Sequence, residues 1–200
     1  MDFSLYKMSP LEEWIYQKYM ENGIQYASDL ELDRISYIFN AEVICTKAPS
    51  HVQWDDEYCL IFINDALDEP NKRAVFFHEL CHPVLHHGNQ RFMPSAFREL
   101  QEIQASHFQL YSAMPIYMLK QFQNLSAPAI AEEFNLPLSL VQTRLQQIHE
   151  RIQHEKSNRQ FIAKIKYYNK ETNSKNWSPE TKRILDKLYK QILKKGAANQ

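Results

Sequence analysis

Residues 75–82 of the chain read Val75-Phe76-Phe77-His78-Glu79-Leu80-Cys81-His82, and they contain the pattern His-Glu-x-x-His. In a helix, four residues make about 1.1 turns, so both imidazoles project from one face, about 6 Å apart along the axis. Two such histidines can converge on one zinc ion at about 2.0–2.1 Å each. The carboxylate of Glu79 would then point beside the ion, where a water molecule would sit.

The residues on either side of this motif predict a helix that follows a strand. Residues 57–64 are rich in β-branched and aromatic side chains and are expected to form a strand. Asp68-Glu69-Pro70 is typical of a helix start, and the helix is predicted to span residues 70–87. The apolar residues 74–77 would bury this helix just before the first histidine.

Periodicity and turn signals in the rest of the chain predict further elements. Ser9-Pro10-Leu11-Glu12 favours a capped helix that stops at Gly23. We expect further helices at residues 30–40, 94–114, 128–134, 138–151 and 178–194, and further strands at residues 41–46 and 51–54. The predicted fold class is therefore α+β, a small domain that is mostly helical after residue 70 and continues into a helical, basic C-terminal extension.

A catalytic zinc site needs a third protein ligand. Glu102 is the preferred candidate, because it lies 20 residues beyond His82 on the next predicted helix, which can fold back against the first. Glu99, one turn earlier, remains an alternative. His86 continues the series of histidines, but in a continuous helix it would lie about 12 Å from His78, too far to share one ion unless Pro83 bends the helix.

Composition excludes several classes of protein. Three glycines, without a Gly-x-Gly pair or a Gly-Lys-Ser/Thr triplet, argue against a nucleotide-binding loop. The cysteines Cys45, Cys59 and Cys81 are odd in number and widely spaced, which does not indicate a disulfide framework. We see no signal peptide and no apolar run of about 20 residues, so we expect a cytoplasmic protein that does not enter a membrane.

The net charge of −1 hides an asymmetry. Residues 1–150 carry 10 Lys and Arg against 20 Asp and Glu, whereas residues 151–200 carry 13 against 4. Such a basic tail could contact nucleic acid, an acidic partner or the acidic part of its own chain, or it could be a solvated helix.

Three segments together resemble the ImmA/IrrE family of metallo-endopeptidases. The first is Phe77-His-Glu-Leu-Cys-His82 with Leu85-His86 just after it. The second is Glu102-Ile-Gln-Ala-Ser-His-Phe108, followed by Ala113-Met-Pro115, which is similar to the family's E-x-x-A-[DN]-x-F-A…L-M-P block. The third, with Ile130-Ala-Glu-Glu-Phe-Asn-Leu-Pro137, is similar to a helix-turn-helix-like stretch. The resemblance covers roughly residues 9–150. Pro83, Ser106 and Gln109 depart from the family's pattern.

The resemblance implies a zincin-like core in which His78, His82 and Glu102 bind Zn²⁺ and Glu79 is the catalytic base. It implies a zinc-dependent endopeptidase that cleaves a helix-turn-helix repressor of a phage or mobile element and so relieves repression. The domains would be a zincin-like peptidase domain at residues 1–125, a helix-turn-helix-like pair packed on it at 126–151, and a basic helical tail at 152–200.

Two other functions remain open. A zinc-stabilised module with little catalytic activity could bind and sequester the repressor without cleaving it. A DNA-binding protein could use residues 128–151, but the second helix there offers only Gln142, Thr143, Arg144 and Gln146 as polar contacts. We therefore do not expect direct DNA binding to be the primary role. The sequence leaves the oligomeric state open.

Overall fold

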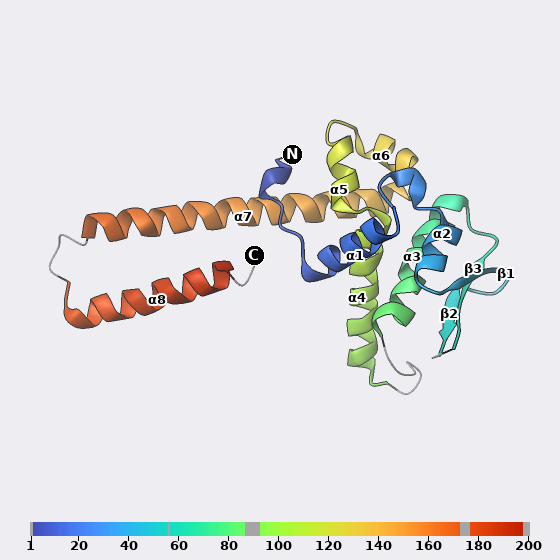
Figure 1. Ribbon diagram of the computed structural model, residues 1–200, viewed down its shortest axis with the longest axis horizontal. Helices are drawn as coiled ribbons and strands as arrows, with labels where there is room; N and C mark the ends of the chain where they lie inside the picture. Colours follow the sequence, from blue (N-terminus) through green and yellow to red (C-terminus); the bar gives the residue numbers. More distant parts are fainter. Residues whose placement is uncertain (1, 56, 87–92, 173–176, 198–200) are drawn as a thin grey trace. The chain divides into compact units, whose positions relative to one another are not determined.

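The computed structural model describes residues 2–55, 57–86, 93–172 and 177–197, and its fold is α+β, as predicted (Figure 1). Two short 3-10 helices and two α-helices precede a small sheet, and helices follow it. In chain order the elements are η1 (Phe3–Leu5), α1 (Pro10–Glu21), η2 (Ala27–Asp29), α2 (Leu32–Ile38), β1 (Glu42–Thr46), β2 (His51–Trp54), β3 (Cys59–Asn64), α3 (Glu69–Leu85), α4 (Ser95–Ala113), α5 (Ile116–Leu119), η4 (Lys120–Phe122), α6 (Ala127–Phe134), α7 (Leu138–Thr172) and α8 (Pro179–Ala197).

The three strands form one mixed sheet in the order β1-β3-β2. β1 runs parallel to β3, with Glu42 opposite Leu60, and β2 runs antiparallel to β3. Burial alternates along β3, whose buried side chains are Cys59, Ile61 and Ile63. This alternation is what a strand with one face on a core requires. The strands predicted at 41–46, 51–54 and 57–64 are confirmed.

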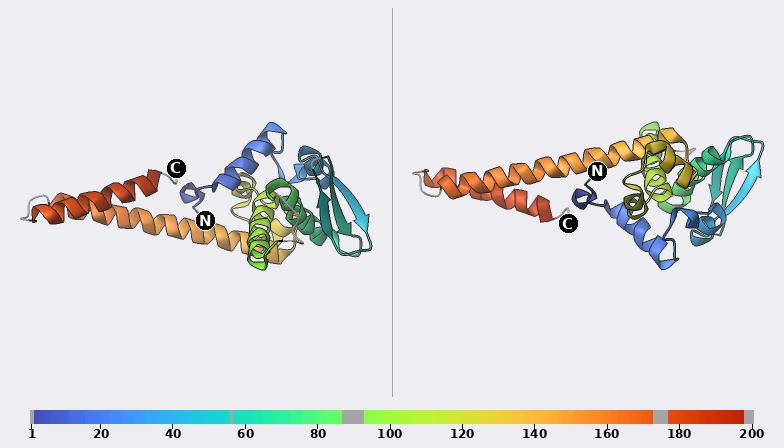
Figure 2. Two further views of the ribbon diagram at one scale, coloured as in Figure 1. Left: turned by 90° about the horizontal axis from the view of Figure 1, so that it is seen from below. Right: turned by 90° about the horizontal axis from the view of Figure 1, so that it is seen from above.

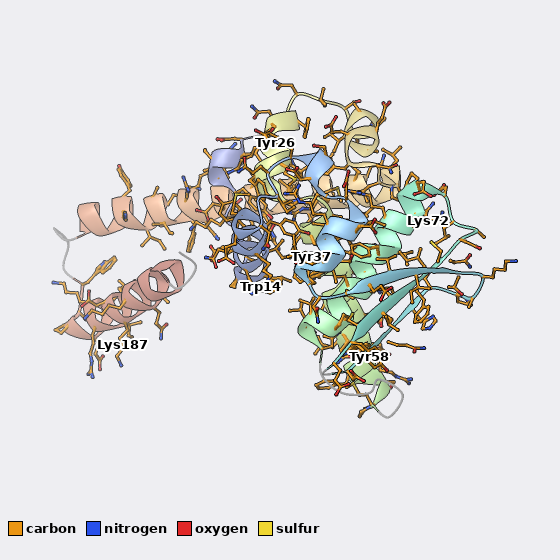
Figure 3. All side chains as sticks on the ribbon, turned by 45° about the vertical axis from the view of Figure 1, so that its right-hand side comes forward. Trp14, Tyr26, Tyr37, Tyr58, Lys72 and Lys187 are labelled. Atoms are coloured by element: carbon orange, nitrogen blue, oxygen red, sulfur yellow. The ribbon has the colours of Figure 1, made fainter. Side chains whose placement is uncertain are left out.

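α3 packs between the sheet and α4, and these three layers hold the core of the first part of the chain (Figures 1 and 2). Its side chains Phe76, Phe77 and Leu80 are fully buried. Lys72, in the first turn of α3, lies at the opposite end of the sheet from Tyr58, in the turn between β2 and β3 (Figure 3). The later turns of α3 therefore run toward the end of the sheet that carries Tyr58.

α1 begins and ends as its sequence predicts. Ser9 and Glu12 form a reciprocal capping box, in which the Ser9 backbone N–H donates to Oε2 of Glu12 at 2.8 Å. Gly23 follows the helix with φ of +70°, a left-handed conformation that glycine adopts without strain. The hydroxyl of Tyr19 donates to the carbonyl of Ser112 at 3.1 Å, which joins α1 to the last turn of α4.

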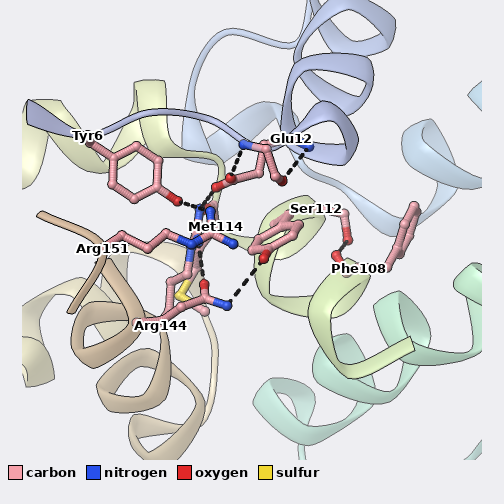
Figure 4. A network of polar contacts seen from close by, with 10 residues as sticks. Tyr6, Glu12, Phe108, Ser112, Met114, Arg144 and Arg151 are labelled. Carbon is pink, nitrogen blue, oxygen red and sulfur yellow. Dashed lines mark hydrogen bonds and ion pairs between the residues drawn. The ribbon is translucent and has the colours of Figure 1, made fainter. Parts of the chain in front are cut away.

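The side chain of Arg144 is fully buried and joins three elements (Figure 4). Its Nη2 lies 2.7 Å from Oε1 of Glu12, and its Nη1 donates to Oε1 of Gln147 at 2.6 Å. Its Nε donates to the carbonyl of Met114 at 3.4 Å, and its guanidinium carbon lies 4.7 Å from the ring centre of Tyr111. Arg144 therefore anchors α7 to α1 and to the end of α4.

The chain divides into two compact units. The first comprises residues 8–149, and the second comprises residues 2–7 with the described part of residues 150–200. In the second unit, Arg151 donates to the hydroxyl of Tyr6 at 2.9 Å, and Lys7 lies 3.4 Å from Glu155.

One sequence prediction about the helices is wrong, and two short helices were missed. The helix predicted to end at Arg151 continues as α7 to Thr172, because no glycine or proline interrupts residues 138–172. The short helices α5 and η4 were not predicted; Pro115 caps the first of them.

None of the helices in the described parts of the chain combines the length with the apolar character that a membrane span requires.

Candidate metal centre

α3 presents His78 and His82 on one face, as their spacing predicts. Asp68 caps the start of the helix: its side chain accepts a hydrogen bond from the backbone N–H of Asn71, and Pro70 lies in the first turn. The ring centroids of the two histidines are 5.6 Å apart. His82 is buried, whereas the His78 side chain is about a quarter exposed.

Glu102 on α4 reaches both histidines. Its Oε2 lies 3.1 Å from Nε2 of His78, and its Oε1 lies 3.8 Å from Nε2 of His82. One ligand atom from each of the three residues lies within 4.8 Å of the other two. The structure thus brings together the three side chains that the sequence predicts as ligands. Glu99, the alternative, lies one turn earlier on α4 and does not belong to this cluster among the described residues.

The cluster fits a zinc ion in its donor chemistry and in its spacing. Two imidazole nitrogens and one carboxylate oxygen are the protein ligands of the His₂Glu class of catalytic zinc sites. Ligand atoms at about 2.1 Å from a tetrahedral ion lie roughly 3.4 Å apart. The distances of 3.1 Å and 3.8 Å lie on either side of that value.

Burial prepares His82 to act as a metal ligand. Desolvation lowers the pKa of His82 to about 4, although the nearby carboxylate of Glu102 opposes the shift. Burial also lowers the pKa of His86. A neutral imidazole keeps a lone pair, so His82 can bind a cation at neutral pH without first losing a proton.

Glu79 follows His78 on α3 and is half-buried beside the cluster. Burial raises the pKa of its carboxyl; the charge of His78 lowers it again, and that of Glu102 adds to the rise. A carboxylate with a raised pKa is a stronger base, because general catalysis works best when the pKa approaches the working pH. Glu79 can therefore take up and release a proton beside the three ligand atoms.

His86 does not extend the cluster, but it contacts one of its members. The backbone at His86 leaves the helix with φ of −112° and ψ of 133°, and the buried ring lies beside His82. Nδ1 of His86 is 3.0 Å from Nδ1 of His82, and Nε2 of His86 is 3.0 Å from Oε1 of Gln104. Sequence reasoning weighed His86 as a third ligand, and it gave Gln104 no role in the site. Pro83 indicated that the helix could bend nearby.

Two departures from the expected family pattern have local structural roles. The hydroxyl of Ser106 donates to the backbone carbonyl of Glu102 at 2.9 Å, within α4. The amide of Gln109 donates to the carbonyl of Ala74 at 2.7 Å and so ties α4 to α3. Neither side chain contacts a ligand histidine through these bonds.

The edges of the site come from β2 and α4. The ring of Trp54, the last residue of β2, stacks over His82 with centroids 6.3 Å apart. A hollow of about 430 Å³ also borders Glu102; it is lined by Ser95, Arg98, Glu99, Glu102 and Ile103. The first turns of α4 also expose large apolar side chains, Phe97, Leu100 and Ile103.

Comparison with known proteins connects this site to a described family. The family model of the IrrE N-terminal-like domain, Peptidase_M78, matches residues 45–146, which include all three residues of the cluster and Glu79. The chain is 28% identical over 166 residues to the phage-like element PBSX protein XkdA of Bacillus subtilis (strain 168), covering 80% of this chain and 81% of that protein. It is 23% identical over 125 residues to the uncharacterized protein YqaB of the same organism, covering 62% and 71%.

Proposed function

Because the chain belongs to the ImmA/IrrE family of metallopeptidases, we propose that it is a zinc-dependent endopeptidase that cleaves a helix-turn-helix repressor of a phage or mobile element. Cleavage would relieve repression by that protein. The observation that carries the proposal is the meeting of His78, His82 and Glu102, with Glu79 beside them.

In this function, His78 and His82 on α3 and Glu102 on α4 hold the metal. A zinc ion bound there would polarise the scissile carbonyl and lower the pKa of a bound water toward about 7. Glu79 accepts a proton from the attacking water and delivers one to the nitrogen of the leaving amine. Burial raises the pKa of Glu79, and this favours both transfers. The carboxylate becomes a stronger base toward the water, and the protonated carboxyl persists to higher pH, where it can donate to the leaving amine.

The arrangement of β2 supports a protein substrate. β2 pairs with β3 on one side, and no other described strand pairs with its outer edge. An extended peptide can add to such an edge through main-chain hydrogen bonds. Because Trp54 at the end of β2 stacks over His82, a peptide on this edge would pass the metal site. The relative XkdA is named as a protein of the phage-like element PBSX, and this name supports a phage or mobile element as the origin of the repressor.

The first test is the zinc content of the purified protein, measured by inductively coupled plasma mass spectrometry. We expect about one zinc per chain in the wild type, and its loss in Glu102→Ala. Glu99→Ala is the matched control, because it removes the same side chain one turn away and should keep the metal. Zinc that is retained without Glu102 and lost without Glu99 would contradict the ligand assignment.

The second test separates cleavage from sequestration. Glu79→Gln should keep zinc and still bind a candidate helix-turn-helix repressor of a phage or mobile element, but should not cut it. Retained cleavage by Glu79→Gln would refute the role of Glu79 as the base. A wild type that holds zinc and binds the repressor without cutting it would favour the sequestering function instead.

A further inference from the structure

Three side chains lie in line behind the metal centre. Gln104 on α4 contacts the ring of His86 at 3.0 Å, and the opposite side of that ring contacts His82 at 3.0 Å. We propose that Gln104 and His86 form a hydrogen-bonded relay that fixes the tautomer of His82 and aims its Nε2 lone pair at the metal position. The inference rests on the proposed function in so far as a metal is bound there.

The direction of the relay follows from the chemistry of its first member. Oε1 of Gln104 can only accept a hydrogen bond, so Nε2 of His86 must donate its proton. A neutral imidazole carries one N–H, so Nδ1 of His86 keeps a lone pair and accepts from Nδ1–H of His82. His82 then has its own lone pair on Nε2, the atom that lies 3.8 Å from Oε1 of Glu102.

The end of α3 places His86 where the relay needs it. In a continuing helix, His86 would lie one more turn along the axis, about 6 Å beyond His82. His86 keeps this position as the C-terminal capping residue of α3, and its ring centroid lies 5.1 Å from that of His82. The N–H of His86 still donates to the carbonyl of His82 at 2.9 Å, which fixes this turn of the chain. Pro83, within the last turn, has no N–H with which to continue the helical pattern.

The two histidines are shielded from water, so the hydrogen bond between them has a large effect on the orientation of the His82 ring. His82 and His86 are each only 4% exposed. A hydrogen bond in a buried site is stronger than in water, and a buried imidazole without a partner is costly. Ser106, which stands where the expected family pattern has Asp or Asn, is engaged with the backbone of Glu102. The contact that can orient His82 therefore comes from His86 and not from position 106.

Support of this kind changes metal affinity. A ligand histidine whose other ring nitrogen donates to a fixed partner keeps the correct tautomer and orientation, and loss of the partner typically weakens metal binding about 10–100-fold. We expect His86→Leu, which fills the space without an acceptor, to weaken zinc binding by about that factor. His86→Asn should rescue most of the loss, because its amide oxygen can replace Nδ1 as acceptor.

Gln104→Leu tests the far end of the relay. Because Gln104 is exposed, this substitution should not prevent folding. It should weaken zinc binding by less than His86→Leu, because water can partly replace the amide. His107→Ala is the matched control: His107 is an exposed histidine on α4 that stacks on Tyr111 and lies outside the relay. Its zinc affinity should equal that of the wild type.

Two measurements decide the proposal. One is the zinc affinity of each variant, by competition with a chromophoric chelator. The other is the tautomer of His82 in the metal-free protein, from the nitrogen chemical shifts of its ring. We expect the proton on Nδ1 in the wild type and in His86→Asn, and a shift of the proton toward Nε2 in His86→Leu.

An unchanged tautomer and unchanged zinc affinity in folded His86→Leu would overturn the relay while leaving the proposed function intact. A proton on Nε2 of His82 in the metal-free wild type would overturn it as well. If the wild type binds no zinc, the proposed function fails, and the tautomer in the metal-free protein still decides the relay.

Discussion

Arg144→Met should destabilise the first unit strongly, because it removes one partner of a buried ion pair. The guanidinium is fully buried, and the Glu12 side chain that faces it at 2.7 Å is only 3% exposed. Methionine has a similar length and keeps the apolar part of the packing. The substitution therefore tests the charge and the hydrogen bonds rather than the volume.

The expected loss in free energy of unfolding depends on the polar groups that Arg144→Met leaves in the core. Breaking a buried pair by removing one partner costs about 3–5 kcal/mol, because the remaining buried charge loses a charged hydrogen-bond donor. In this chain Glu12 retains the bond from the backbone N–H of Ser9, but the carbonyl of Met114 and the amide of Gln147 lose a charged donor. For a protein of this size we expect a fall in Tm of roughly 10 °C.

The assay is urea unfolding, followed by circular dichroism, of the wild type and four variants: Arg144→Met, Glu12→Gln, the double variant and a control. Glu12→Gln with Arg144→Met removes both charges, and its loss should be smaller than the sum of the single losses by about 1–3 kcal/mol. Arg159→Met is the matched control, since Arg159 pairs with Glu155 at 2.9 Å on the same helix but is 56% exposed. Exposed pairs contribute about 0–1 kcal/mol.

A loss below about 1 kcal/mol for Arg144→Met, equal to that of the Arg159 control, would refute the reasoning. The same conclusion would follow if the two single losses at positions 12 and 144 were additive, because residues in direct contact should couple.

Three further predictions concern the metal-free protein. The free energy of unfolding should fall by about 2 kcal/mol when the pH is lowered from about 7 to about 5. Burial holds the pKa of His82 at about 4 in the folded protein, against 6.5 for an exposed imidazole. Over this pH range, protons therefore bind the unfolded chain and favour unfolding. The slope should flatten in His82→Asn, and a urea midpoint that does not change with pH in the wild type would contradict the assignment. At about pH 8, a thiol reagent should label the exposed Cys45 and leave Cys59 and Cys81 unmodified until the protein unfolds. The reason is that burial raises the pKa values of Cys59 and Cys81 to about 11 and about 12. Fast labelling of all three cysteines would show that the core opens. Ser9→Ala should lower the free energy of unfolding by about 1 kcal/mol in urea titrations, because it removes the cap of α1, and no change would mean that Glu12 alone holds the helix start.

The sequence was sufficient where the information is local. Two histidines four residues apart must share a face of a helix, so their meeting needed no knowledge of the rest of the chain. The third member of the cluster required the packing of α3 on α4. Glu99 and Glu102 lie one turn apart on α4, and only the register of the two helices decides which of them reaches His78.

The sequence was insufficient where distant residues meet or the backbone leaves a regular helix. Arg144 counted as a polar residue available to DNA, yet it is buried against Glu12, 132 residues away along the chain. His86 was weighed as a third ligand that only a bend at Pro83 could bring to the ion, whereas its contact with His82 depends on ring orientations that the spacing does not give. Gln104 is exposed on α4, and although it lies in the segment that resembles the family, nothing in the sequence indicated its contact with His86.

The end of α3 at Leu85 also limits how this region can change in evolution. Ligand spacing within a helix tolerates substitution, because the helix itself keeps His78 and His82 in phase. The three residues between His82 and His86 form the last turn of the same helix, and they set where the His86 ring lies. Deleting or inserting one of them would turn the His86 ring away from its partner even if every ligand survived. Transplanting the centre into another scaffold would therefore require residues 78–86 and 102–104 as two intact blocks.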